Sequence, residues 1–343
     1  GPSGDLYVLD WHDADICGKE VLNKETGRIF RISPTKSLAK DWDGRYTDLK
    51  KLTDDALAGL QTSTSDWHAR RARVLLQHRA SSRSLSPGSV AQLRSLFQES
   101  KNGDYRLRAL WTLYITGNFK EGDLQKALTD KDEYVRAWAI QFLCEDNNAS
   151  KNATDIMVMM SRNDPSPVVR LYLSAALQRI DADARWQIAE GLISQAKDLE
   201  DHNIPKMIWY GMEGLVEKAP EKAITMVAAG KVPLIAEFTA RRLVDANALT
   251  LLVNELGKSP AQLTAMLNGL LAGLEGRSDI KAPASWETVY RKLKSQKSVA
   301  PLALEVAQLF GDSEAAQKYL ATLKNAVAPV EARRDALRSL ASR

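Results

Sequence analysis

The sequence predicts an all-α protein in which helices stack in pairs, preceded by one short β-type segment. One observation is a recurring motif: an acid, then a core aliphatic residue followed by arginine, then an apolar helix. A second is the helical period of apolar residues, which continues from Leu52 to the C-terminus with only short breaks. Recurrence at intervals of 28 to 38 residues is typical of helical repeat arrays.

The clearest copy of the motif occupies residues 130–143. Asp132 can cap a helix in which Val135 and Phe142 fall on one apolar face, and Arg136 follows the first core residue. The other copies are Asp66 with Ala69-Arg70, Asp104 with Leu107-Arg108, and Asp164 with Val169-Arg170. We therefore predict an α-solenoid of HEAT-like repeats.

The composition agrees with many packed helices and narrows the classes of partner. Hydrophobic residues make up 44% and aromatic residues 7% of the 343 residues. The 47 basic and 43 acidic residues leave a formal charge of +4, too weak a balance to indicate a nucleic-acid or membrane partner. Two cysteines, Cys17 and Cys144, exclude a disulfide framework and leave the redox compartment undecided.

Residues 1–33 differ from the rest of the chain. Residues 5–9 and 28–32 are short β-type runs, so we expect a hairpin. Two strands alone are marginal in water, and this pair needs more sheet, or the helices, to pack against. No charged-then-apolar leader opens the sequence, and Gly1 leads directly into the first run. We expect a piece of a longer chain.

The remaining residues are predicted to form a linker and then helices. Residues 34–51 are polar and irregular, 52–180 contain the regular repeats, and 181–343 contain irregular HEAT-like pairs and a cap. No apolar run reaches the roughly 18 residues of a membrane-spanning helix. The expected helices are 53–61, 66–79, 88–99, 104–116, 121–129, 132–145, 152–161, 167–180, 182–197, 204–218, 220–229, 232–245, 247–257, 260–275, 284–295, 299–310, 313–325 and 328–342.

The charged residues of the repeats have two interpretations. They could be the acids and anion-binding arginines of a cleft, or a ladder in which an aspartate at a helix start meets the arginine of a neighbouring repeat. We favour the ladder, because charge-assisted hydrogen bonds of this kind would hold the register between repeats. Its predicted members are Asp104, Arg108, Asp132, Arg136, Asp164 and Arg170.

Two other stretches hold side chains capable of chemistry. His12, Asp13 and Asp15, with Cys17 nearby, could ligate a cation, but their spacing matches no standard metal motif and a polar β-loop is the simpler interpretation. His202, Trp209 and Tyr210 could line a ligand groove or an interaction face. The simpler interpretation there is a helix, capped by Asp201 or Asn203 near Pro205, that buries Ile208, Trp209 and Met212.

The sequence lacks the common catalytic and cofactor motifs. It contains no G-x-G-x-x-G after a strand, no phosphate loop, no G-x-S-x-G, no H-E-x-x-H and no C-x-x-C-H. We therefore predict no catalytic residue and no bound cofactor in this chain.

Four segments resemble one bacterial family. They are G-P-S-G-D-L-Y-V-L-D-W-H-D (1–13), T-G-R-I-F-R-I (26–32), S-D-W-H-A-R-R-A-R-V-L-L-Q-H-R (65–79) and D-H-N-I-P-K-M-I-W-Y-G-M-E (201–213). Together they are similar to membrane-bound dehydrogenase-like proteins, whose propeller is like that of PQQ-dependent sugar dehydrogenases. In many relatives His follows the cysteine equivalent to Cys17, but here Gly18 follows, which weakens any ligand role for that loop.

The resemblance implies a parent protein built from a β-propeller, HEAT repeats and a c-type cytochrome domain, exported to the periplasm or secreted. The hairpin would be the remnant of the propeller, and PQQ and haem would belong to flanking domains. This chain would then be a scaffold that holds the propeller against the cytochrome domain or a protein partner.

Two rival functions remain. The first is a HEAT-like nucleic-acid-binding or DNA-repair protein, for which the basic candidates are Arg70, Arg71, Arg73, Arg241 and Arg242. The near balance of charge argues against it. The second is a catalytic solenoid that uses the region around His202 and Trp209, for which the sequence offers no acid/base pair of clear geometry.

Overall fold

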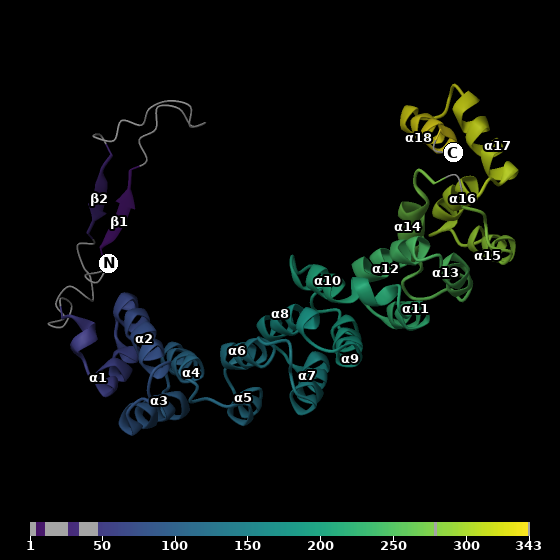
Figure 1. Cartoon of the computed structure of the whole chain (residues 1–343). Coiled ribbons are helices and arrows are strands. Elements are labelled where there is room, and N and C mark those ends of the chain that lie inside the picture. Colours follow the sequence, from purple (N-terminus) through teal and green to yellow (C-terminus); the bar gives the residue numbers. More distant parts are fainter. Residues whose placement is uncertain (1–4, 11–26, 34–46, 278–279, 342–343) are drawn as a thin grey trace. The chain divides into compact units, whose positions relative to one another are not determined.

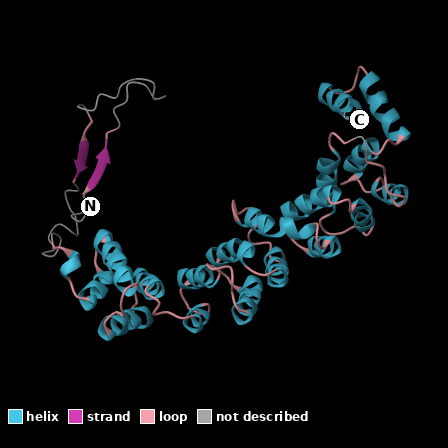
Figure 2. Ribbon diagram, viewed as in Figure 1, coloured by secondary structure: helices cyan, strands magenta, loops and turns pink. Residues whose placement is uncertain are grey.

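A computed structural model describes residues 5–10, 27–33, 47–277 and 280–341. These residues form a mostly helical protein with one two-stranded antiparallel sheet at the N-terminus (Figure 2), so the all-α prediction with a small hairpin is confirmed. The chain divides into two compact units, Gly1–Leu124 and Gln125–Arg343. This division falls within the stretch expected to contain the regular repeats.

The hairpin consists of β1 (Leu6–Leu9) and β2 (Ile29–Ile32), labelled in Figure 1. Leu6 pairs with Ile32 and Leu9 with Ile29. All residues of both strands are exposed, although most of them are apolar. The hairpin therefore has no packed face among the described residues.

The helices of the first unit bury their apolar faces against each other. α1 packs on α3, and α2 packs on α4. The 3-10 helix η2 joins this core through Leu49, which clusters with Leu57, Leu75 and Leu76. The elements are η2 (Leu49–Lys51), α1 (Asp54–Gly59), η3 (Leu60–Thr62), α2 (Asp66–Ala80), α3 (Pro87–Glu99), α4 (Gly103–Ile115) and α5 (Glu121–Ala127), which crosses the boundary between the units.

The second unit continues with helices that contact the next helix and the next but one, as stacked pairs do: α7 packs on α9, and α12 packs on α14. A β-carbon at Gly269 would lie 2.0 Å from the Glu237 carbonyl oxygen, so α14 needs glycine there to approach α12. The elements are α6 (Glu133–Leu143), α7 (Lys151–Asn163), α8 (Pro167–Ala176), η4 (Leu177–Arg179), α9 (Ala182–Ile193), α10 (Ile204–Val216), α11 (Pro220–Ala229), α12 (Pro233–Asp245), α13 (Leu249–Leu256), α14 (Leu263–Leu274), α15 (Trp286–Leu293), α16 (Ala300–Leu309), α17 (Ser313–Lys324) and α18 (Val330–Ala341).

Local sequence explains where many helices begin. Ser86 and Ser166 accept hydrogen bonds from the first turns of α3 and α8, and a proline occupies the start of each helix. Asp132 and Asp181 cap α6 and α9 in the same way. Among the helices that the structure describes, none combines the length and apolarity needed to cross a bilayer.

Candidate functional site

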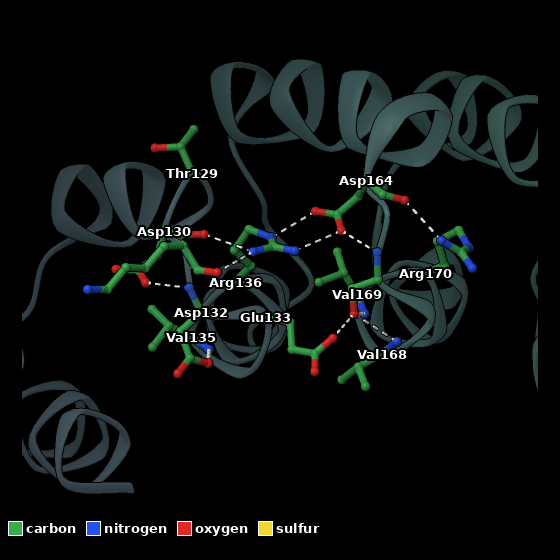
Figure 3. Close-up of polar contacts among 12 residues, drawn as sticks. Thr129, Asp130, Asp132, Glu133, Val135, Arg136, Asp164, Val168, Val169 and Arg170 are labelled. Carbon is green, nitrogen blue, oxygen red and sulfur yellow. Dashed lines mark hydrogen bonds and ion pairs between the residues drawn. The ribbon is translucent and has the colours of Figure 1, made fainter. Parts of the chain in front are cut away.

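Arg136 on α6 forms the centre of a hydrogen-bond network (Figure 3). Its Nε and Nη2 donate to the two carboxylate oxygens of Asp164 at 2.8 and 2.9 Å, and its Nη1 donates to the carbonyl oxygen of Asp130 at 2.8 Å. The Arg136 and Asp164 side chains are only 12% and 6% exposed. A bidentate pair at this burial fixes the start of α8 against α6.

Arg170 on α8 repeats this geometry one step further along the chain. It donates to the Asp198 carboxylate at 2.5 and 2.7 Å, and its Nη1 donates to the Asp164 carbonyl oxygen at 2.9 Å. These hydrogen bonds to Asp198 raise the pKa of Arg170 above its ordinary value. Asp164 thus connects Arg136, through its carboxylate, with Arg170, through its backbone.

Sequence reasoning missed Asp198 because the repeat motif is not evident beyond residue 181. A signal was nevertheless present, since Asp198 follows Arg170 by 28 residues and Asp164 follows Arg136 by the same interval. A search for acids at that spacing would have found it.

The other predicted members of the ladder, Arg108, Asp132 and Asp104, do not form a pair of the kind that Arg136 and Arg170 form. Arg108 pairs with Asp66 at 2.6 Å, towards the N-terminus, and also donates to the carbonyl oxygens of Gln61 and Ser63. Asp132 caps its own helix. Asp104 lies exposed in the first turn of α4, whose cap is Asn102 rather than Asp104.

A shallow depression of about 540 Å³ lies beside the Arg136 network. It is lined by the starts of α6 and α8, including Glu133, Tyr134 and Ser166. Glu133 accepts a hydrogen bond from the Ser166 hydroxyl, which also caps α8. Hydrogen bonds thus hold Glu133, Ser166 and Arg136 to neighbouring polar groups.

The stretch around His202 leads into α10, in which Ile208 and Met212 are buried and Trp209 is half-buried. Asp201 accepts hydrogen bonds from the backbone N–H groups of Asn203 and Ile204 at the start of α10. Trp209 packs edge-on against Phe238, with ring centroids 5.5 Å apart. His202 is exposed, and Tyr210 is 57% exposed.

A mainly apolar hollow of about 500 Å³ separates α9 from α11. Trp186, Ile193 and Met226 line it, and the Lys222 ammonium group lies 5.4 Å from the centre of the Trp186 ring. Its rim carries both acids and a base, so its charge favours no particular ligand.

The basic residues of the nucleic-acid hypothesis belong to different units and have different surroundings. Arg70 lies 3.8 Å from Asp66, and Arg242 lies 3.0 Å from Glu217. Arg73 packs over Trp111 at 5.0 Å, and its burial lowers its pKa. Arg71 and Arg241 are exposed.

Metal and thiol chemistry find little support in the residues that the structure describes. His12, Asp13, Asp15 and Cys17 lie outside those residues, which contain no group of three or more side chains placed to hold a metal ion. Cys144 is a free, buried thiol, and its burial raises its pKa to about 11. A thiol in that state is unreactive.

Comparison with known proteins does not identify a family. The sequence matches no protein-family model and no curated protein.

Proposed function

We propose that this chain is a non-catalytic helical-repeat scaffold of a larger exported, dehydrogenase-like protein. It would hold a sugar-dehydrogenase-like propeller against a cytochrome domain or a protein partner. The observation that supports it best is a contrast in burial. The helices bury even charged pairs such as Arg170 and Asp198, whereas the hairpin leaves its apolar side chains exposed.

The exposed hairpin indicates the kind of surface that it contacts. Val8 and Phe30 are paired across the strands and are 42% and 50% exposed, and Leu9 and Ile29 at the end of the ladder are 75% and 69% exposed. A two-stranded sheet is marginal in water, and its edges offer unpaired backbone groups. A neighbouring sheet would cover the apolar side chains and pair with the free backbone groups of the strand edges. The sequence resemblance suggests that this sheet is a propeller blade.

In this proposal the catalytic chemistry belongs to flanking domains. PQQ would bind to the propeller and haem to the cytochrome domain, and neither cofactor would bind to this chain. The resemblance also suggests the periplasm or the exterior as the location.

The coding sequence on both sides of this segment tests the proposal. We expect propeller-blade repeats immediately upstream of Gly1 and a C-x-x-C-H motif downstream of Arg343. Flanking regions that encode neither would contradict it.

A second test uses the hairpin itself. Amide hydrogen exchange at residues 6–9 and 29–32 should be fast in this chain and strongly slowed in the longer protein. Phe30→Lys should abolish that slowing, whereas the control Val327→Lys, at an exposed apolar residue on the helical side, should not. Equal exchange in both proteins would show that the hairpin has no docking partner there.

The proposed lack of catalytic activity can be tested directly on the purified chain. The purified chain would be mixed with PQQ, Ca²⁺, a panel of aldoses and an artificial electron acceptor. We expect no turnover above a blank and no stoichiometric uptake of PQQ. Turnover would show that the catalytic site lies in this chain.

A further inference from the structure

A basic hollow of about 440 Å³ lies on the first unit, between α2 and the 3-10 helix η2. Its lining residues are Lys50, Arg71, Leu75, His78, Arg79 and Ser82. Among the described residues, its lining therefore contains three permanently charged cations and no carboxylate. A hollow of this size is comparable to a small-molecule site.

Helical spacing places the side chains of this hollow together. Arg71, Leu75 and His78 recur at intervals of four and three residues, so they lie along one face of α2. Lys50 comes from the opposite wall. The neighbouring Leu49 packs with Leu75 in the core, and this packing seats η2 against α2.

Hydrogen bonds hold two walls of the hollow in place. Arg79 donates through Nη2 to the carbonyl oxygen of Lys50 at 2.9 Å, and through Nη1 to Asp54 at 2.8 Å. The Lys50 backbone N–H donates to Asp48, which caps η2. The backbone of Lys50 is therefore fixed before any ligand arrives, which lowers the entropic cost of binding.

Two acids beside the hollow, Asp48 and Asp54, neutralise its cations only in part. Asp54 is 5% exposed and accepts hydrogen bonds from both Arg79 and Arg83. Two guanidinium groups share the Asp54 carboxylate and Asp48 lies beside Lys50, so the four cations Lys50, Arg71, Arg79 and Arg83 face two carboxylates. An excess of like charge in a concave site concentrates small anions there.

We propose that this hollow is a binding site for a phosphate-bearing small molecule, with Lys50 and Arg71 as the ligand-binding cations and Arg79 as a fixed positive wall. A phosphate group carries close to two negative charges at neutral pH and several acceptor oxygens, which suits a guanidinium fork opposite an ammonium group. Leu75 provides an apolar floor for the body of such a ligand. The site is independent of the scaffold proposal.

Inorganic phosphate and pyrophosphate are the probes, with acetate at matched ionic strength as the control anion. Binding would be followed by NMR of the imidazole groups in the full chain, which contains four histidines. The His78 signals should move and saturate with phosphate, more tightly with pyrophosphate, and should not saturate with acetate. The exposed His202 serves as an internal control and should not move.

Two variants inside the hollow and one outside it sharpen the result. Lys50→Gln and Arg71→Gln should each weaken pyrophosphate binding by about fivefold or more, because each removes a charge-assisted contact. Arg70→Gln removes the same charge from the same helix but outside the hollow, and should change the affinity by less than about twofold. All three residues are exposed, so the variants should fold normally.

A fluorescent DNA duplex distinguishes a pocket from a broad basic face. Duplex binding that is weakened as much by Arg70→Gln as by Arg71→Gln would overturn the proposal and favour a nucleic-acid interface. Shifts of His78 that do not saturate, or equal losses of pyrophosphate affinity in all three variants, would overturn it as well.

Discussion

The arginine of the repeat motif is paired differently in the two units. In the second unit, Arg136 and Arg170 each bind an aspartate 28 residues later, and both pairs are largely buried. In the first unit, Arg108 binds Asp66, 42 residues earlier, and that carboxylate is 66% exposed. The same motif thus gives a buried contact in one unit and a half-solvated one in the other.

This difference shows that the motif sets the position of an arginine in the helix but does not determine which acceptor that arginine binds. Counting 28 residues from Arg108 leads to Arg136, another cation, whereas the same count from Arg136 and Arg170 leads to acids. Arg108 instead takes the carbonyl oxygens of Gln61 and Ser63 together with Asp66. How deeply each pair is buried therefore depends on which acceptor groups lie within reach of the arginine.

Breaking the most buried pair should have the largest effect. Arg170→Ala should lower the free energy of unfolding by about 3–5 kcal/mol, because Asp198 would remain buried without a cation. Urea unfolding would measure it. The double variant Arg170→Met/Asp198→Leu should be clearly more stable than Arg170→Ala, and a double variant that is as unstable would show that the uncompensated charge is not the cause.

Breaking the neighbouring pair, Arg136 and Asp164, should lower the free energy of unfolding somewhat less. Arg136→Ala should cost about 1–3 kcal/mol, since Asp164 would lose a bidentate partner but keep its bond from the Ser166 backbone. Lys126→Ala, at an exposed position, should stay within roughly 0.5 kcal/mol in the same unfolding assay. Similar losses in the two variants would contradict the role given to Arg136.

Among the described residues of the first unit, Asp54 is a buried acid that allows a test by pH. Hydrogen bonds from Arg83, opposed by burial and supplemented by Arg79 and Ser86, hold the pKa of Asp54 well below its ordinary value. Because the pKa is lowered by folding, Asp54 stabilises the folded state above about pH 4, and this contribution is lost as the pH falls further.

Asp54→Asn should therefore cost about 1–2 kcal/mol at pH 7 and less at pH 3, where the wild type has lost part of the same contribution. Thermal unfolding at a series of pH values would measure it. Asp55→Asn, one residue away and exposed, is the matched control. A loss for Asp54→Asn that stays constant down to pH 3 would show that ionisation is not its source.

Breaking the exposed pair of the first unit, Arg108 and Asp66, should have the smallest effect on the free energy of unfolding. Asp66→Asn should change the unfolding free energy by no more than about 0.5–1 kcal/mol, because water and salt screen a carboxylate at this exposure. The effect should shrink between low and high salt, whereas that of Arg170→Ala should persist. A large, salt-independent loss for Asp66→Asn would remove the contrast between the two units.

The sequence by itself determined the helical class, the N-terminal hairpin and many of the helix starts. Apolar spacing marked the buried face of α6, and Val135 and Phe142 lie in the core. The expected starts of α3 and α8, at residues 88 and 167, lie within one residue of those observed, because capping by serine and the fixed φ of proline are local properties. Asp201 was likewise one of two candidates at the start of α10.

Only the tertiary structure decided which charges meet. The sequence offered both Asp132 and Asp164 as members of the ladder, and only the packed helices show that Asp164 binds Arg136 while Asp132 serves as the helix cap. Lys50 and Arg71 lie far apart in the sequence, and packing of Leu49 on Leu75 places both on one hollow. Local periodicity fixes which face of a helix is apolar, but the partner of a polar side chain depends on how separate helices pack, and no single segment encodes that packing.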